Sequence, residues 1–319
     1  MASMITMFLQ SAYSMIDGLF VSNLIGDTAL SAVNVAWPII AVVTAIGTGV
    51  GCGGAVMMST KQGEGKNEES NIVRANVILA LLASSIVVTI LFLILLTPLL
   101  KLMGAEGELL RLSQIYGRVM LTGGVLQILS CGLTPLLRND NRAVSAMMIM
   151  VGGLFVNLGL DFVFMYVFHM GIGGAAGASL CAQLFTTLCC LIILGTKKTD
   201  PIRFSQFIIR KEYWKKIFKT AVSPFGISLT PSLLILYHNV ACLKFGGDLA
   251  VNAYALISST VGSYRVLLIG VAEGIQPLAS YAYGAHDFHA IRKIRNKAVI
   301  TAMSVSFFLF IFTIATARF

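Results

Sequence analysis

Long apolar stretches alternate with short polar connections along the whole chain. A helix needs about 20 apolar residues to cross a bilayer. Stretches of roughly this length lie near residues 5–25, 30–58, 75–100, 113–137, 143–168, 172–195, 218–243, 250–278 and 298–317. No strand-like alternation supports a barrel, so backbone groups in lipid must be satisfied within helices. The pattern predicts an all-α polytopic membrane protein with nine spans.

An internal repeat divides these spans into two groups. Residues 26–74 align without a gap to residues 247–295, which lie 221 positions later. Transporters often build two lobes around a central site from such repeats. We expect an N-lobe of six spans over residues 1–200 and a partial C-lobe of three spans over residues 201–319. The identical pairs are Gly26–Gly247, Asp27–Asp248, Ala29–Ala250, Ala32–Ala253, Gly49–Gly270, Val50–Val271, Gly53–Gly274, Ser59–Ser280, Gly63–Gly284 and Arg74–Arg295.

The repeat also indicates how long a chain with two complete copies would be. Two complete copies would need about 440 residues (twice the offset of 221), whereas the chain has 319. We therefore expect a C-terminally truncated second lobe, and a polypeptide that transports poorly or not at all.

Between the lobes, Thr196–Thr220 mixes basic and apolar residues, which predicts a helix at the membrane interface.

Charge placement predicts the orientation in the membrane. The chain is 57% hydrophobic and only 12% charged, with a net charge of +9. Nearly all Lys and Arg residues fall in even-numbered connections, whereas the odd-numbered ones hold Lys101, Arg111 and Lys244. By the positive-inside rule the N-terminus and the even connections face the cytoplasm. Basic residues spread over separate membrane-edge loops do not favour nucleic-acid binding.

Two other classes of site find little support in the sequence. The six cysteines lie in apolar spans, without a C-x-x-C pair or an accompanying His pattern, which favours inert buried thiols over metal ligands. Gly49–Gly54 matches a dinucleotide-binding pattern, but it lies inside an apolar span and favours close helix packing. We expect no cofactor.

Acidic residues inside the spans are the strongest functional signal. A carboxylate in mid-bilayer costs about 2.5–3.5 kcal/mol, so it usually faces a cavity and carries an ion or a substrate. Asp17 and Asp161 are such residues, and Asn157 lies one helical turn before Asp161 on the same face. Carboxylate and amide oxygens suit sodium, and a protonated carboxyl beside an amide suits a proton. Asp17, Asn157 and Asp161 are therefore the predicted cation-coupling residues.

Two residues of the second copy are secondary candidates. The repeat aligns Asp17 with His238 and Cys52 with Glu273. A lone His on a helix is more often a hydrogen-bonded packing residue than a titrating site. Glu273 follows Arg265 by about two turns, so a structural interaction and a functional role both stay open.

Several of these stretches resemble the multidrug and toxic compound extrusion (MATE) family, most closely its bacterial DinF-like branch. The motifs are Tyr13-Ser-Met-Ile-Asp17-Gly-Leu-Phe-Val, Thr134-Pro-Leu-Leu-Arg138-Asn-Asp140-Asn, Asn157-Leu-Gly-Leu-Asp161 followed by Gly171-Ile-Gly-Gly-Ala-Ala, and Glu273-Gly-Ile-Gln-Pro277-Leu-Ala-Ser-Tyr-Ala-Tyr-Gly284-Ala. The resemblance covers essentially the whole chain.

This resemblance implies a twelve-helix exporter of two lobes, of which about nine helices are present here. It implies a proton- or sodium-driven antiporter and not an enzyme. Such a protein exports drugs or organic cations from the bacterial cytoplasm across the inner membrane by alternating access. We expect it to act as a monomer. The family's N-lobe cation site corresponds to Asp17, Asn157 and Asp161. Residues 218–243 contain no Asp or Glu, so the acids that some relatives carry on this span have no counterpart.

Two other functions are considered as alternatives to an antiporter. A lipid-linked oligosaccharide flippase would line its cavity with several basic groups, and only Arg118 and Arg265 are candidates within spans. An intramembrane aspartyl protease would need Asp17 and Asp161 to meet, usually within a G-x-G-D turn that this chain lacks.

Overall fold

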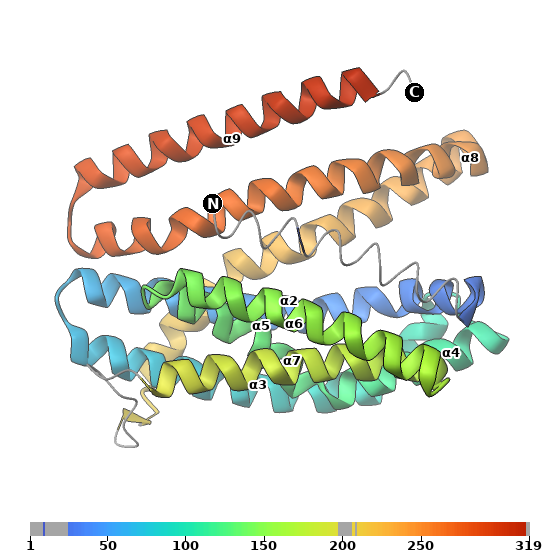
Figure 1. Ribbon diagram of the computed structural model, residues 1–319, viewed down its shortest axis with the longest axis horizontal. Coiled ribbons are helices and arrows are strands. Elements are labelled where there is room, and N and C mark those ends of the chain that lie inside the picture. The colour runs from blue at the N-terminus through green and yellow to red at the C-terminus, as the bar shows by residue number, and fades with distance from the viewer. Residues whose placement is uncertain (1–8, 10–24, 197–205, 208, 317–319) are drawn as a thin grey trace.

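The protein is a bundle of long helices (Figure 1). The computed structural model describes residues 9, 25–196, 206–207 and 209–316, and these residues contain no strand. The helices are α2 (Asp27–Gly63), α3 (Asn67–Leu102), α4 (Gly107–Thr122), α5 (Gly124–Asn139), α6 (Ala143–Asp161), the π-helix η1 (Phe162–Val167), α7 (Gly171–Gly195), α8 (Lys211–Gly284) and α9 (Phe288–Thr316).

The predicted all-α membrane fold is confirmed. Five segments of the described chain are long and apolar enough to span a bilayer: α2, α3, α6 with η1, α7 and α9. The predicted span 113–137 is instead the pair α4–α5, bent by 57° at Gly123. A Gly pair at 123–124 breaks the helix there, as expected for a sharp kink. The predicted span 5–25 lies almost entirely outside the described residues.

Two predicted spans, 218–243 and 250–278, are the two arms of α8. In a straight helix His238 and Tyr254 would lie about 24 Å apart. Their rings instead stack with centroids 5.1 Å apart, so the chain reverses between them. Figure 1 shows the helix turning back at the right-hand side.

The predicted interfacial segment Thr196–Thr220 is described only in part, because residues 197–205 and 208 lie outside the described residues. Its last ten residues, 211–220, form the first turns of α8, which runs on from Lys211 without a break. Tyr213 and Ile217 are buried, whereas Lys215 and Lys219 are exposed. The segment therefore has the two faces expected from its sequence, but it is continuous with the span that follows.

The repeat seen in the sequence is also present in the backbone. The turn between α2 and α3 and the turn between α8 and α9 start and end at positions 221 apart. Equivalent hydrogen bonds close them, from Lys66 N to Lys61 O in the first and from Asp287 N to Ala282 O in the second, both 3.0 Å long. Each turn contains one left-handed residue, Gly65 with φ 74° and His286 with φ 55°.

Glycines allow α2 to lie at the centre of the bundle. A Cβ at Gly51 would collide with the backbone of Gly132 on α5, and one at Gly53 would lie 2.7 Å from the backbone nitrogen of Ala221 on α8. The Gly-rich stretch thus faces α5 on one side and α8 on the other. This confirms the prediction that it serves helix packing and not nucleotide binding.

The two lobes contact each other symmetrically where α2 and α8 end. A Cβ at Gly63 would collide with the carbonyl of Tyr281, and a Cβ at Gly284 would collide with the carbonyl of Thr60. Both pairs, 63–284 and 60–281, are repeat equivalents, so the contact is a pseudo-twofold one. We call this end of the bundle, which carries the turns 64–66, 140–142 and 285–287, the basic end. The helices α2 and α8 are closed against each other there.

Candidate functional site

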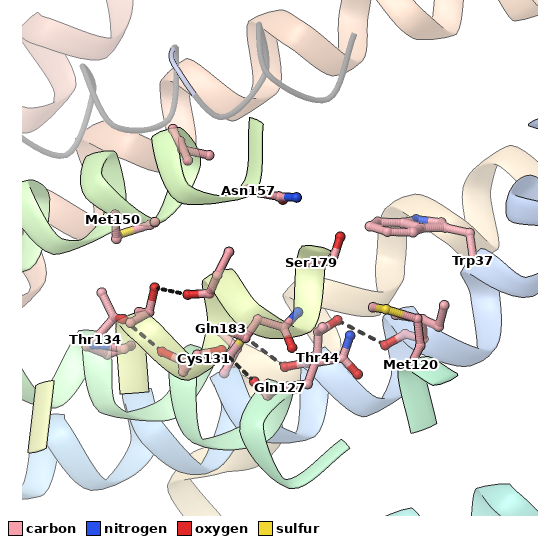
Figure 2. Close-up of a pocket in the computed structure, with 18 of the residues that line it drawn as sticks. Trp37, Thr44, Met120, Gln127, Cys131, Thr134, Met150, Asn157, Ser179 and Gln183 are labelled. Carbon is pink, nitrogen blue, oxygen red and sulfur yellow. Dashed lines mark hydrogen bonds between the residues drawn. The ribbon is translucent and has the colours of Figure 1, made fainter. Parts of the chain in front are cut away.

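A cavity of about 400 Å³ lies mainly among α2, α5, α6 and α7. Trp37, Met120 and Met150 supply broad apolar surfaces to its wall (Figure 2). The wall also contains uncharged polar or weakly polar residues, namely Thr44, Thr48, Gln127, Ser130, Cys131, Thr134, Asn157, Ser179, Gln183 and Thr186. Arg138 and Glu273 are the charged side chains in the lining, among the residues described.

Unsatisfied polar groups mark this cavity as a place that can receive a ligand. The Gln127 side chain is 1% exposed. Its Oε1 and that of Gln183 are buried without a hydrogen-bond partner in the described part of the chain. A buried acceptor without a partner is costly and calls for an explanation such as a ligand or water. Both amides are labelled in Figure 2, on α5 and α7.

The predicted pair Asn157–Asp161 lies together on α6. Asn157 Nδ2 donates to Asp161 Oδ2 at 2.9 Å, and the two residues are 6% and 0% exposed. Asn157 is also part of the cavity wall, so Asp161 lies one turn beyond that wall. The pair can hold a proton or contribute two oxygens to a sodium ion.

A local change of helix type follows this pair at once. The π-helix η1 begins at Phe162, and Phe168 N donates to Val163 O, a bond that spans five residues. Such π-segments are rare and frequently occur at functional sites. The sequence Phe-Val-Phe-Met-Tyr-Val does not differ from that of an ordinary apolar helix, so the π-segment could not be predicted from it.

The remaining candidates are placed differently. Asp17 lies outside the described residues, so its distance to Asp161 stays a prediction. His238 is on α8, where its Nδ1 lies 2.7 Å from the carbonyl of Leu234 and its ring stacks on Tyr254. It therefore has the packing contacts expected of an ordinary helix His, and it is not part of the cavity wall.

The side chain of Glu273 makes a contact between the two lobes. Its carboxylate accepts a hydrogen bond from Arg138 at the end of α5, rather than from Arg265 on its own helix. Next to this pair, Asn139 Nδ2 donates to Gln276 Oε1 at 2.9 Å, and Ser59 Oγ donates to Asn139 Oδ1 at 2.7 Å. These contacts join α2, α5 and α8 at the basic end, where Arg138 and Glu273 form the floor of the cavity.

A buried ion pair supports the same floor from below. Arg74 and Asp140 are each about 1% exposed in their side chains, and their charged atoms lie 3.8 Å apart. The spans predicted from the sequence put both residues in connections at the membrane edge. Asp140 does lie in the turn that follows α5, whereas Arg74 belongs to α3. Both side chains are buried, and their charges neutralise each other.

Comparison with known proteins decides the family. The sequence profile of MatE matches residues 2–163 and 227–319. The chain belongs to the MatE family. The proteins of this family are efflux transporters rather than enzymes, and the several apolar helices of the chain agree with a multi-pass membrane protein.

Individual relatives agree with this assignment. The chain is 25% identical to multidrug export protein MepA of Staphylococcus saprophyticus subsp. saprophyticus over 282 residues, which are 88% of this chain and 62% of that protein. It is 25% identical to MepA of Staphylococcus aureus (strain NCTC 8325 / PS 47) over 305 residues, 95% of this chain and 66% of that one. The chain thus spans somewhat less than two thirds of these relatives.

Solved structures show the same fold. A MATE structure in complex with MaL6 superposes with a TM-score of 0.93 at 25% identity, covering 99% of this chain and 70% of that one. An outward-facing multidrug resistance MATE transporter of the MOP superfamily gives 0.93 at 26% identity, with the same coverage. The DinF-like branch stays a prediction.

Proposed function

We propose that this chain is part of a proton- or sodium-coupled antiporter that exports small organic cations by alternating access. The main support for this proposal is the buried Asn157–Asp161 pair, which lies at the wall of a cavity with aromatic, thioether and uncharged polar groups. Such a wall suits amphipathic molecules of varied shape. The MepA relatives are named multidrug export proteins, which supports export of varied small molecules.

Competition for negative charge would couple the two fluxes. With Asp161 ionised, an organic cation in the cavity is stabilised by the nearby carboxylate. A proton or sodium ion that binds the carboxylate removes this attraction and favours release of the organic cation. One-for-one exchange of a singly charged organic cation for a proton or a sodium ion moves no net charge across the membrane, so the concentration gradient of the coupling ion drives it. Each tenfold ion gradient supplies about 1.4 kcal/mol and can sustain a gradient of the organic cation of up to about tenfold.

The positive-inside rule supplies the orientation in the membrane. It assigns the basic end to the cytoplasm of a bacterial cell and the N-terminus to the same side. Closure of α2 against α8 at that end then corresponds to a cavity shut off from the cytoplasm. We expect the transporter to act as a monomer, without a cofactor.

The flippase alternative is less well supported. A pyrophosphate group calls for several free basic side chains in the cavity. Arg138 is the basic residue in the described lining, and Glu273 neutralises it. The wall therefore favours a cationic or neutral ligand over an anionic one.

Binding of a fluorescent organic cation such as ethidium tests this function in the 319-residue chain. The protein has two tryptophans, and Trp37 lies in the cavity wall. In a Trp214→Phe background, we expect ethidium to quench the emission of Trp37 in a saturable way. A Gln127→Leu/Gln183→Leu variant should bind less tightly by about tenfold, because two acceptors are lost. Saturable binding without any quenching of Trp37 would place the ligand elsewhere.

A further inference from the structure

The pair Arg138–Glu273 stands out because both of its charges reach the cavity from different lobes. Arg138 belongs to α5 and Glu273 to the second arm of α8. Their side chains are 10% and 22% exposed, and both line the cavity. Two opposite charges in such a place are normally retained only if they neutralise each other or if one of them serves a ligand.

The guanidinium is only partly engaged in this contact. Arg138 Nη1 donates to Glu273 Oε2, while its Nε is buried without a hydrogen-bond partner in the described part of the chain. A two-bond fork between arginine and a carboxylate would be a tighter and more specific arrangement. A single hydrogen bond of this kind holds the carboxylate less firmly than a fork and is easier for another cation to replace.

We infer that Glu273 is a second cation subsite of the transporter, occupied in turn by the Arg138 guanidinium and by the positive group of an organic cation. This inference rests on the proposed export function. In the arrangement seen here the basic end is closed and Arg138 holds the carboxylate. When the lobes part at that end, Arg138 moves away with α5 and Glu273 stays on α8.

The exchange would give the carboxylate two uses. A separated Glu273 faces the cytoplasmic opening as an unneutralised charge, which attracts an entering organic cation. On closure Arg138 returns, competes for the same carboxylate and displaces the cation toward the remainder of the cavity and Asp161. Glu273 would thus favour loading from the cytoplasm and prevent the substrate from remaining at the floor.

A double-mutant cycle with ethidium and Trp37 emission tests the competition. Arg138→Gln removes the competitor, so we expect about tenfold tighter binding. Arg138→Gln/Glu273→Gln should bind no more tightly than the unsubstituted chain, because the gain depends on the carboxylate. An uncharged dye of similar size should bind all variants alike. Unchanged affinity in Arg138→Gln, or a gain that persists without Glu273, would overturn the inference.

A second variant keeps the test decisive if Arg138→Gln does not fold. Glu273→Gln leaves the arginine charge without a counter-charge in the cavity, so ethidium should bind about tenfold more weakly while the uncharged dye is unaffected. Equal loss for both dyes would indicate only a structural role and would refute the subsite. If the unsubstituted chain binds no organic cation at all, the proposed function itself fails. If it binds ethidium but the affinity is the same in all variants, only the proposed Glu273 subsite is refuted.

Discussion

Replacing Asp161 by Asn is expected to remove the dependence of organic-cation binding on pH and on sodium. In the unsubstituted chain, acidification or added sodium should weaken ethidium binding by about tenfold or more, because the carboxylate loses its charge or becomes occupied. A carboxamide has nearly the same shape and can still hydrogen-bond Asn157, but it cannot ionise. The variant should therefore bind weakly under all conditions, as followed by quenching of Trp37.

A surface carboxylate supplies the matched control for this prediction. Asp287 is exposed at the basic end, where its Oδ1 accepts a hydrogen bond from Ala290 N at 2.8 Å. Asp287→Asn makes the same chemical change outside the cavity and should leave the pH and sodium dependence intact. If Asp161→Asn responded to pH and sodium as strongly as the unsubstituted chain, the coupling role of Asp161 would have to be abandoned.

The second large effect is expected at the glycine contact between the lobes. Gly63→Ala and Gly284→Ala each place a methyl group against a backbone carbonyl of the facing helix, and such overpacking costs about 1–3 kcal/mol. Each substitution separates the same two helices. The double variant should therefore lose much less stability than the sum of the single losses. The apparent melting temperature in detergent measures these losses, and we expect it to fall by several degrees in each single variant.

Gly226 on α8 provides the comparison. A Cβ at Gly226 would have no neighbour within 4 Å, so Gly226→Ala should keep or slightly raise the melting temperature through better helix propensity. Additive losses from Gly63→Ala and Gly284→Ala would mean that the two glycines do not share one contact. Equal losses in all three variants would show a general effect of removing helical glycines.

Much of the fold could be predicted because membrane spans and repeats have strong sequence signals. A run of apolar residues is a direct consequence of lipid contact. The offset of 221 that joins Gly63 to Gly284 also holds for helix ends and turns, since both copies use the same turn geometry. The bend at Gly123 was not predicted, because two adjacent glycines in an apolar run indicate close packing as readily as a kink.

The candidate site could be predicted only where its residues lie on one helix. Asn157 and Asp161 are one turn apart, so their contact follows from helical periodicity. The cavity wall has a weaker signal of the same kind, since Gln127, Ser130 and Thr134 also repeat at helical spacing. The contact of Arg138 with Glu273 joins residues 135 positions apart, and no local pattern encodes which charge of one lobe meets which charge of the other.

The most direct test of the account is to count the ions released when an organic cation binds. Antiport through Asp161 requires that the two kinds of cation exclude each other. On addition of ethidium to the 319-residue chain in weakly buffered solution, pH and sodium electrodes should record release of a proton or a sodium ion. Asp161→Asn should release neither while it still binds the dye at high concentration. Dye binding to the unsubstituted chain without release of either ion, or equal release from the variant, would contradict the account.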